Sequence, residues 1–170
     1  TMATGDRIDI VPPQRFVPEN GPVTDVKLRQ SGAVLGFPLP DADTGFYFMS
    51  RVPTNGTPVS TGLTFQILLV DDPSNSDPGK VVRLGVTVKK IASTTDDLTA
   101  TGAGTEAVGT ATMNATTGIV TALSIAVTTS NADSIAAGDL IEVRIRRTGS
   151  NASDTHKGVV LVAQVTVSDT

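Results

Sequence analysis

Apolar residues recur at every second position along several segments of this sequence, and this period of two restricts the fold more than any other feature. The alternation runs through residues 82–88, 119–127, 140–146 and 159–167. A strand that alternates in this way buries one face and leaves the other in solvent. Residues 45–51 and 62–70 are apolar on both faces, which is typical of central strands. The sequence therefore predicts an all-β protein.

Turn-forming residues separate these segments. Asn55-Gly56 and Asp77-Pro78-Gly79 are examples. About eight strands with regular turns indicate an antiparallel β-sandwich, and a jelly roll is the expected topology. A Greek-key or immunoglobulin-like sandwich is the alternative, although the chain has neither the Trp nor the Cys that mark immunoglobulin domains.

The prolines divide the chain unevenly, since most of them lie in the first forty residues and none follows Pro78. Proline interrupts strand ladders and helices. We therefore expect an extended N-terminal arm over residues 1–40, with short strands at Arg7–Val11 and 25–30, and a β-sandwich body over residues 41–170. Residues 92–117 are rich in Ala, Gly, Thr and Ser, which predicts a long loop and a short edge strand.

Composition excludes several kinds of site. The chain contains no Cys and one His, so thiolate chemistry and multi-histidine metal sites are ruled out. A net charge of −4 disfavours nucleic acid as a partner. No apolar run approaches the roughly 18 residues of a membrane span, and no glycine-rich phosphate loop precedes a helix. We expect no cofactor, nucleic acid or membrane partner.

Polar residues in the turns offer weak candidates for chemistry. Asp71, Asn75 and Asp77 place oxygen atoms in one loop, which makes them weak candidates for a calcium site, but the same residues are ordinary turn formers beside proline. His156 is the only available imidazole base, and its position in a polar turn predicts a solvent-exposed side chain. The sequence also lacks a nucleophile elbow, so no enzyme is expected.

Aromatic residues are few, and Tyr47 is the candidate for a surface contact. Phe46 and Phe48 flank it in a strong strand and are expected in the core, which turns Tyr47 outward. The Tyr47 ring would contact either another subunit or a sugar.

Five segments resemble small structural proteins encoded by tailed phages. They are the opening residues 2–6 (MATGD), the turn at 117–120 (TGIV), the segment 134–140 (SIAAGDL) with the Arg-rich strand after it, the loop 151–155 (NASDT) and the apolar last strand. The resemblance covers the first few residues and about residues 60–170.

The resemblance implies a non-enzymatic virion protein with a jelly-roll module, most simply a capsid decoration (cement) protein. It implies assembly as a homotrimer and contact with other virion proteins such as the major capsid protein. A tail fibre or baseplate module is one alternative, and a carbohydrate- or calcium-dependent adhesion module is another. The residues expected at the interface are Pro12, Pro13, Phe16, Pro18, Tyr47, Val160 and Val162.

Overall fold

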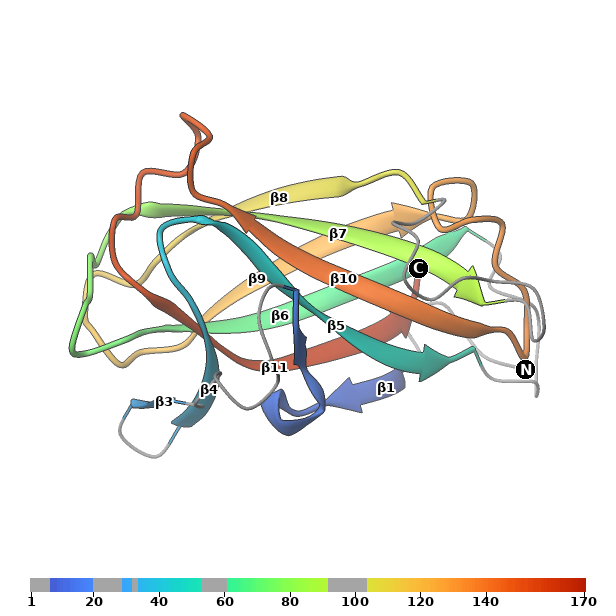
Figure 1. The fold of residues 1–170 in the computed structure, drawn as a ribbon, viewed down its shortest axis with the longest axis horizontal. Coiled ribbons are helices and arrows are strands. Elements are labelled where there is room, and N and C mark those ends of the chain that lie inside the picture. The colour runs from blue at the N-terminus through green and yellow to red at the C-terminus, as the bar shows by residue number, and fades with distance from the viewer. Residues whose placement is uncertain (1–6, 20–28, 32–33, 53–60, 92–103) are drawn as a thin grey trace.

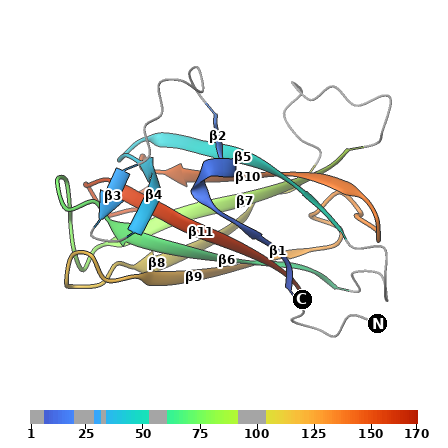
Figure 2. The same ribbon diagram turned by 90° about the horizontal axis from the view of Figure 1, so that it is seen from below.

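The computed structural model describes residues 7–19, 29–31, 34–52, 61–91 and 104–170. Two antiparallel sheets pack face to face in it (Figures 1 and 2). One sheet contains β1 (Arg7–Val11), β3 (Arg29–Ser31), β4 (Val34–Leu39), β6 (Gly62–Asp71), β9 (Thr121–Thr128) and β11 (Val160–Asp169). The other contains β2 (Val17–Pro18), β5 (Asp43–Arg51), β7 (Val81–Ile91), β8 (Ala107–Thr112) and β10 (Leu140–Thr148).

The strand pairing is nested. β7 pairs with β8, β6 with β9, β5 with β10 and β4 with β11, all antiparallel. These eight strands therefore form one long antiparallel hairpin that folds over into two sheets. The strand orders of the two sheets are β4-β11-β6-β9 and β5-β10-β7-β8. This is the arrangement of a jelly roll. The predicted β-sandwich and its jelly-roll topology are confirmed.

The inner faces of both sheets form one core. Buried and outward positions alternate along β10 in register with β5 and β7, as the period of two predicts. Phe46, Phe48 and Phe65 are buried in this core. The edge strand expected near residues 105–113 is β8. The strand expected at 25–30 lies mostly outside the described residues, which include only its end in β3.

A β-bulge in β11 reverses one prediction. Val162 pairs with Leu69 and Gln164 with Leu68, so Ala163 is an extra residue in the ladder. The bulge puts Val160 and Val162 on the same inward face as Val165. Val160 and Val162 were expected to face outward and contact another subunit, and this prediction is wrong because simple alternation from Val165 does not survive the bulge.

The described parts of the proline-rich segment lie within the sandwich. β1 pairs with β11, and β2 pairs with β5 (Figure 2). Between them a short 3₁₀ helix, η1 (Pro13–Arg15), leads into Phe16, whose ring stacks on Phe46 with a centroid distance of 4.1 Å. The expected boundary at residue 40 falls just after β4, which is itself a strand of the first sheet.

The expected interface residues of this segment have different environments. Pro13 and Phe16 are buried in the chain's own fold, Pro12 is exposed and Pro18 is half-buried. Pro13 and Phe16 are therefore not available for contact with another subunit. Across the described ranges, no helix has the length and apolar character needed to cross a membrane.

Candidate functional site

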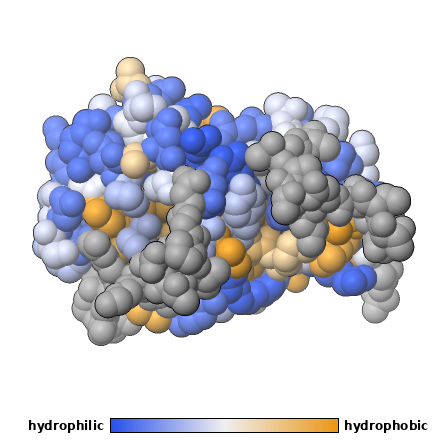
Figure 3. Space-filling model, in the orientation of Figure 1, coloured by the Kyte–Doolittle hydropathy of each residue, from blue (hydrophilic) through white to orange (hydrophobic). Residues whose placement is uncertain are grey.

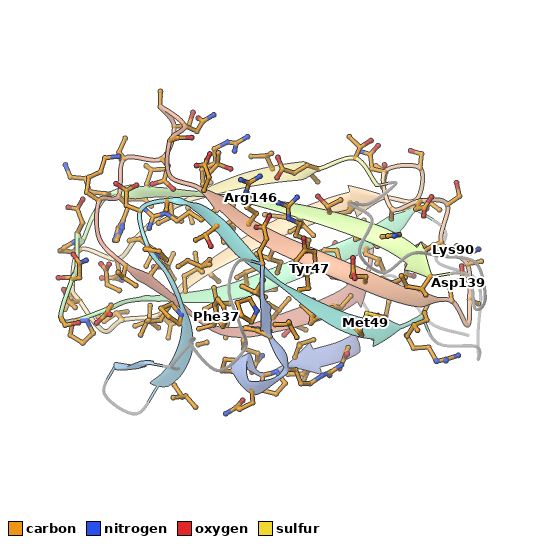
Figure 4. The ribbon with its side chains drawn as sticks, viewed as in Figure 1. Phe37, Tyr47, Met49, Lys90, Asp139 and Arg146 are labelled. Carbon is orange, nitrogen blue, oxygen red and sulfur yellow. The ribbon has the colours of Figure 1, made fainter. Side chains whose placement is uncertain are left out.

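The outward face of the second sheet carries the aromatic and charged side chains that could bind a ligand. Phe46 and Phe48 on β5 point into the core, so Tyr47 between them points out and stays half-buried. Figure 4 shows Tyr47 near the middle of this face, with Arg146 beside it and Met49 further along β5. The predicted outward orientation of Tyr47 is confirmed.

The strand register aligns these residues in rows across β5, β10 and β7. The central row joins Tyr47, Arg144 and Thr87, because Arg144 on β10 lies between the other two. The rows on either side are Gly45 with Arg146 and Gly85, and Met49 with Glu142 and Lys89. Cross-strand neighbours on one face lie within side-chain reach of each other, so an aromatic ring, two guanidinium groups and a carboxylate share a compact area.

Arg144 contacts Tyr47 and Glu19. Its guanidinium carbon lies 6.0 Å from the centroid of the Tyr47 ring, at the limit of a cation–π contact. Its Nη2 also donates to Glu19 Oε1 in an ion pair. Burial raises the pKa of the Tyr47 hydroxyl, and the positive charge of Arg144 opposes that rise. The phenol is therefore neutral around pH 7 and can both donate and accept hydrogen bonds.

Glu19 is held over this face by the backbone. Its N–H donates to the carbonyl of Gly45 at 2.9 Å, which extends the pairing of β2 with β5 by one residue. Its Oε2 lies 3.8 Å from Nε of Arg146 and has no hydrogen-bond partner among the described residues. Nε of Arg144 and Nε of Arg146 are likewise without a partner there. These three atoms are enclosed by the protein, so the groups beside Tyr47 that a ligand could reach are the exposed parts of the Arg144 and Arg146 side chains.

Two glycines flank Arg146 in its row across the sheet. A Cβ on Gly45 would lie 2.2 Å from the carbonyl oxygen of Ile145, so this close approach of two strands admits only glycine. A Cβ on Gly85 would lie 2.2 Å from Oε1 of Glu106, whose side chain covers that position. Arg146 therefore stands between two positions that lack side chains.

The remaining polar groups border the site. Burial raises the pKa of Glu142, and the nearby Lys89 opposes that rise. Lys90 Nζ and Asp139 Oδ2 form an ion pair of 2.9 Å at the far end of the sheet (Figure 4). Figure 3 shows mostly hydrophilic surface with smaller hydrophobic patches on this side of the molecule. Met49 on β5 and Val17 on β2 are among the exposed large hydrophobic residues.

A second polar cluster lies inside the fold. Arg147 is fully buried and forms a two-point ion pair with Asp154, with Nε to Oδ2 at 2.9 Å and Nη2 to Oδ1 at 3.0 Å. Nη1 also donates to the carbonyls of Leu39 and Gly158 at 3.1 and 2.8 Å. These contacts tie the loop after β10 to the end of β4, which is a structural role.

His156 belongs to this buried cluster. Its side chain is fully buried, and Nε2 lies 2.5 Å from Oδ1 of Asp71. The prediction of a solvent-exposed histidine is wrong, because the loop folds inward where Arg147 binds the carbonyl of His156. No signal in the local sequence distinguishes this turn from an exposed one.

The three oxygen-bearing residues proposed for calcium lie close to this cluster. Asp71 accepts from His156 and from the N–H of Asp77, and Asp77 accepts from the N–H of Lys157 at 2.8 Å. Asn75 contributes backbone contacts, with its carbonyl accepting from the N–H of Val159. Within the described part of the chain, no three acidic or imidazole side chains converge as metal ligands.

Comparison with known proteins gives a fold relative but no family. No known family model matches the sequence, and no curated protein matches it. Among solved structures, the chain is similar to CsCBM6-3 from Clostridium stercorarium in complex with cellobiose, with a TM-score of 0.56 and 7% sequence identity over 100% of both chains. This likeness shows a shared β-sandwich fold.

The comparison corrects the function implied by the resemblance to phage proteins. A virion structural protein, as capsid cement or as a tail module, was expected. A solved structure that shares the fold is instead a carbohydrate-binding module. Turn and strand patterns of the kind used for the resemblance report a jelly roll, and unrelated jelly rolls have different functions.

Proposed function

We propose that this protein is a non-catalytic carbohydrate-binding module that binds an oligosaccharide on the outward face of β5, β10 and β7. The observation that carries the proposal is the outward-facing, half-buried Tyr47 ring, which lies beside the partly exposed side chains of Arg144 and Arg146. The likeness to a cellobiose-bound carbohydrate-binding module supports it.

The chemistry of a sugar matches this surface. A pyranose ring has an apolar face of C–H groups that packs on an aromatic ring, and its hydroxyl groups both donate and accept hydrogen bonds. Tyr47 offers the ring and a hydroxyl group, and the partly exposed side chains of Arg144 and Arg146 offer donors. The face is a strand surface held rigidly by the two neighbouring strands, so little ordering is needed on binding.

The experiment measures glycan binding with a panel of neutral and acidic oligosaccharides, including cello-oligosaccharides, by isothermal titration calorimetry. Tyr47→Ala should weaken binding about tenfold, because the buried ring and its stacking contact are lost. Tyr47→Phe should keep most of the affinity, since it keeps the ring.

The matched control is Ser124→Ala, which removes an exposed hydroxyl from β9 on the opposite sheet and should leave affinity unchanged. The proposal fails if no glycan of the panel binds, or if Tyr47→Ala binds as tightly as the native protein.

A further inference from the structure

We infer that the sugar residue bound beside Tyr47 carries a carboxylate, so that the ligand class is an oligosaccharide containing uronic acid, with Arg146 and Arg144 as the residues that recognise the carboxylate. This inference rests on the proposed function, because it specifies the ligand of the same face.

One carboxylate, that of Glu19, lies near the guanidinium groups of both Arg144 and Arg146. Glu19 pairs closely with Arg144, and its other oxygen stays 3.8 Å from Nε of Arg146, beyond hydrogen-bond distance. Nε of Arg146 has no partner among the described residues, and its side chain is one-third exposed (34%). That nitrogen is itself enclosed, but the rest of the side chain makes Arg146 a partly exposed cation that no carboxylate of the described residues meets within hydrogen-bond distance.

Glu19 indicates which kind of anion these two arginines bind. Guanidinium groups bind planar carboxylates through paired N–H donors. The Glu19 side chain already presents a carboxylate to both arginines. A uronate carboxylate would either share the pair with Glu19 or replace it, and in both cases it would lie against the exposed part of the Arg146 side chain.

The charges on this face determine which way the carboxylate of a bound sugar points. Glu142 lies in the row beyond Tyr47, on the side away from Arg146. Lys89 lies beside Glu142 in that row and offsets its charge, so the attraction of a ligand carboxylate to Arg146 sets the direction. The sugar ring on Tyr47 should therefore turn its carboxylate toward the row of Arg146.

The experiment compares oligomers of galacturonate, glucuronate and mannuronate with their own methyl esters. The ester keeps the sugar ring and removes the charge. The native protein should bind at least one acid form about tenfold more tightly than its ester, because hydrogen bonds to charged groups are lost in the ester. This preference should shrink as salt is raised, since the site is partly exposed.

Two variants test the assigned residues. Arg146→Gln should abolish the preference for the acid form and leave the affinity for the ester nearly unchanged. Glu19→Gln should increase the affinity for the acid form several-fold, because it removes the competing carboxylate. The control is Arg51→Gln, which removes a positive charge from the end of β5, the strand that carries Tyr47, and should change the preference little.

The outcomes separate the two proposals. Binding of neutral glycans or esters as tightly as acids, with loss on Tyr47→Ala, overturns this inference and leaves the proposed function standing. Binding of sulfated glycans alone also overturns it. The absence of binding to every glycan, acidic or neutral, overturns both proposals.

Discussion

At the scale of single residues, Arg147 has the largest fully buried side chain among the residues that the structure describes. It is completely enclosed, and its donors are met by Asp154 and by backbone carbonyls. A buried ion pair is no guarantee of net stability, but the loss of one partner leaves a charge without compensation in a medium of low polarity.

We therefore expect Asp154→Ala to lower the free energy of unfolding by about 3–5 kcal/mol. Asp154 also accepts from the N–H groups of Arg83 and His156, so the substitution removes their partner as well. Urea-induced unfolding measures the change through the midpoint, provided that the slope of the transition stays constant.

Lys157→Ala is the control for that experiment. Lys157 pairs with Asp41 at 3.4 Å on the surface of the same loop, with its side chain 63% exposed. Its loss should cost less than about 1 kcal/mol, as for other exposed pairs. Equal costs for the two variants would contradict the assigned role of Arg147.

The residues of this cluster also show what the sequence could not predict. Asp71, Asp154 and His156 are far apart or in ordinary turns along the chain, and nothing in their spacing reveals that they are buried together. Tyr47 was predictable, because alternation fixes its face. Its contact with Arg144 and the approach of Glu19 depend on strand register and on the path of residues before β5, which alternation does not report.

At the scale of elements, the β-bulge in β11 decides which valines belong to the core. The alternation of apolar residues correctly predicted a strand here, yet the extra residue Ala163 changes the face of everything before it. The bulge is invisible to a periodicity argument because residues 159–162 before it are apolar at every position and therefore fit either face.

The bulge predicts that substitutions at two neighbouring positions lower the free energy of unfolding by unequal amounts. Val162→Asn should lower the free energy of unfolding by about 3 kcal/mol or more, since a buried valine is lost and an unpaired amide replaces it. Ala163→Asn, at a half-buried position, should cost about 1 kcal/mol or less. Thermal or urea unfolding of both variants provides the measurement, and the reverse order would place Ala163 in the core instead of Val162.

At the scale of the whole molecule, the first strands complete the sandwich. β1 pairs with the part of β11 that lies beyond its pairing with β4. Phe16 packs in the core against Phe37 and Phe46. The prolines of this segment correctly indicated irregular structure, since η1 interrupts the path from β1 to β2. Proline content did not reveal where that path packs, and it concealed β4, which contains Pro38.

Deletion of residues 1–18 should therefore destabilise the remaining chain by several kcal/mol, because the core loses Phe16 and β11 loses a neighbour. Phe16→Ala in the full chain is the partner variant, with an expected cost of about 3–5 kcal/mol. Circular dichroism during urea unfolding follows both. A deletion variant as stable as the native protein would show that the segment is an independent arm.

The nested pairing of the strands has a consequence for how the chain reaches this fold. β7 and β8 are close in sequence and can meet early, whereas β4 and β11 are joined only after a long loop closes. β11 is also the strand that pairs with β1, β4 and β6. Before it docks, those partners present unpaired backbone edges to other molecules. We therefore expect the chain to be most prone to aggregation before β11 docks. The rate at which β11 docks sets how long that state lasts.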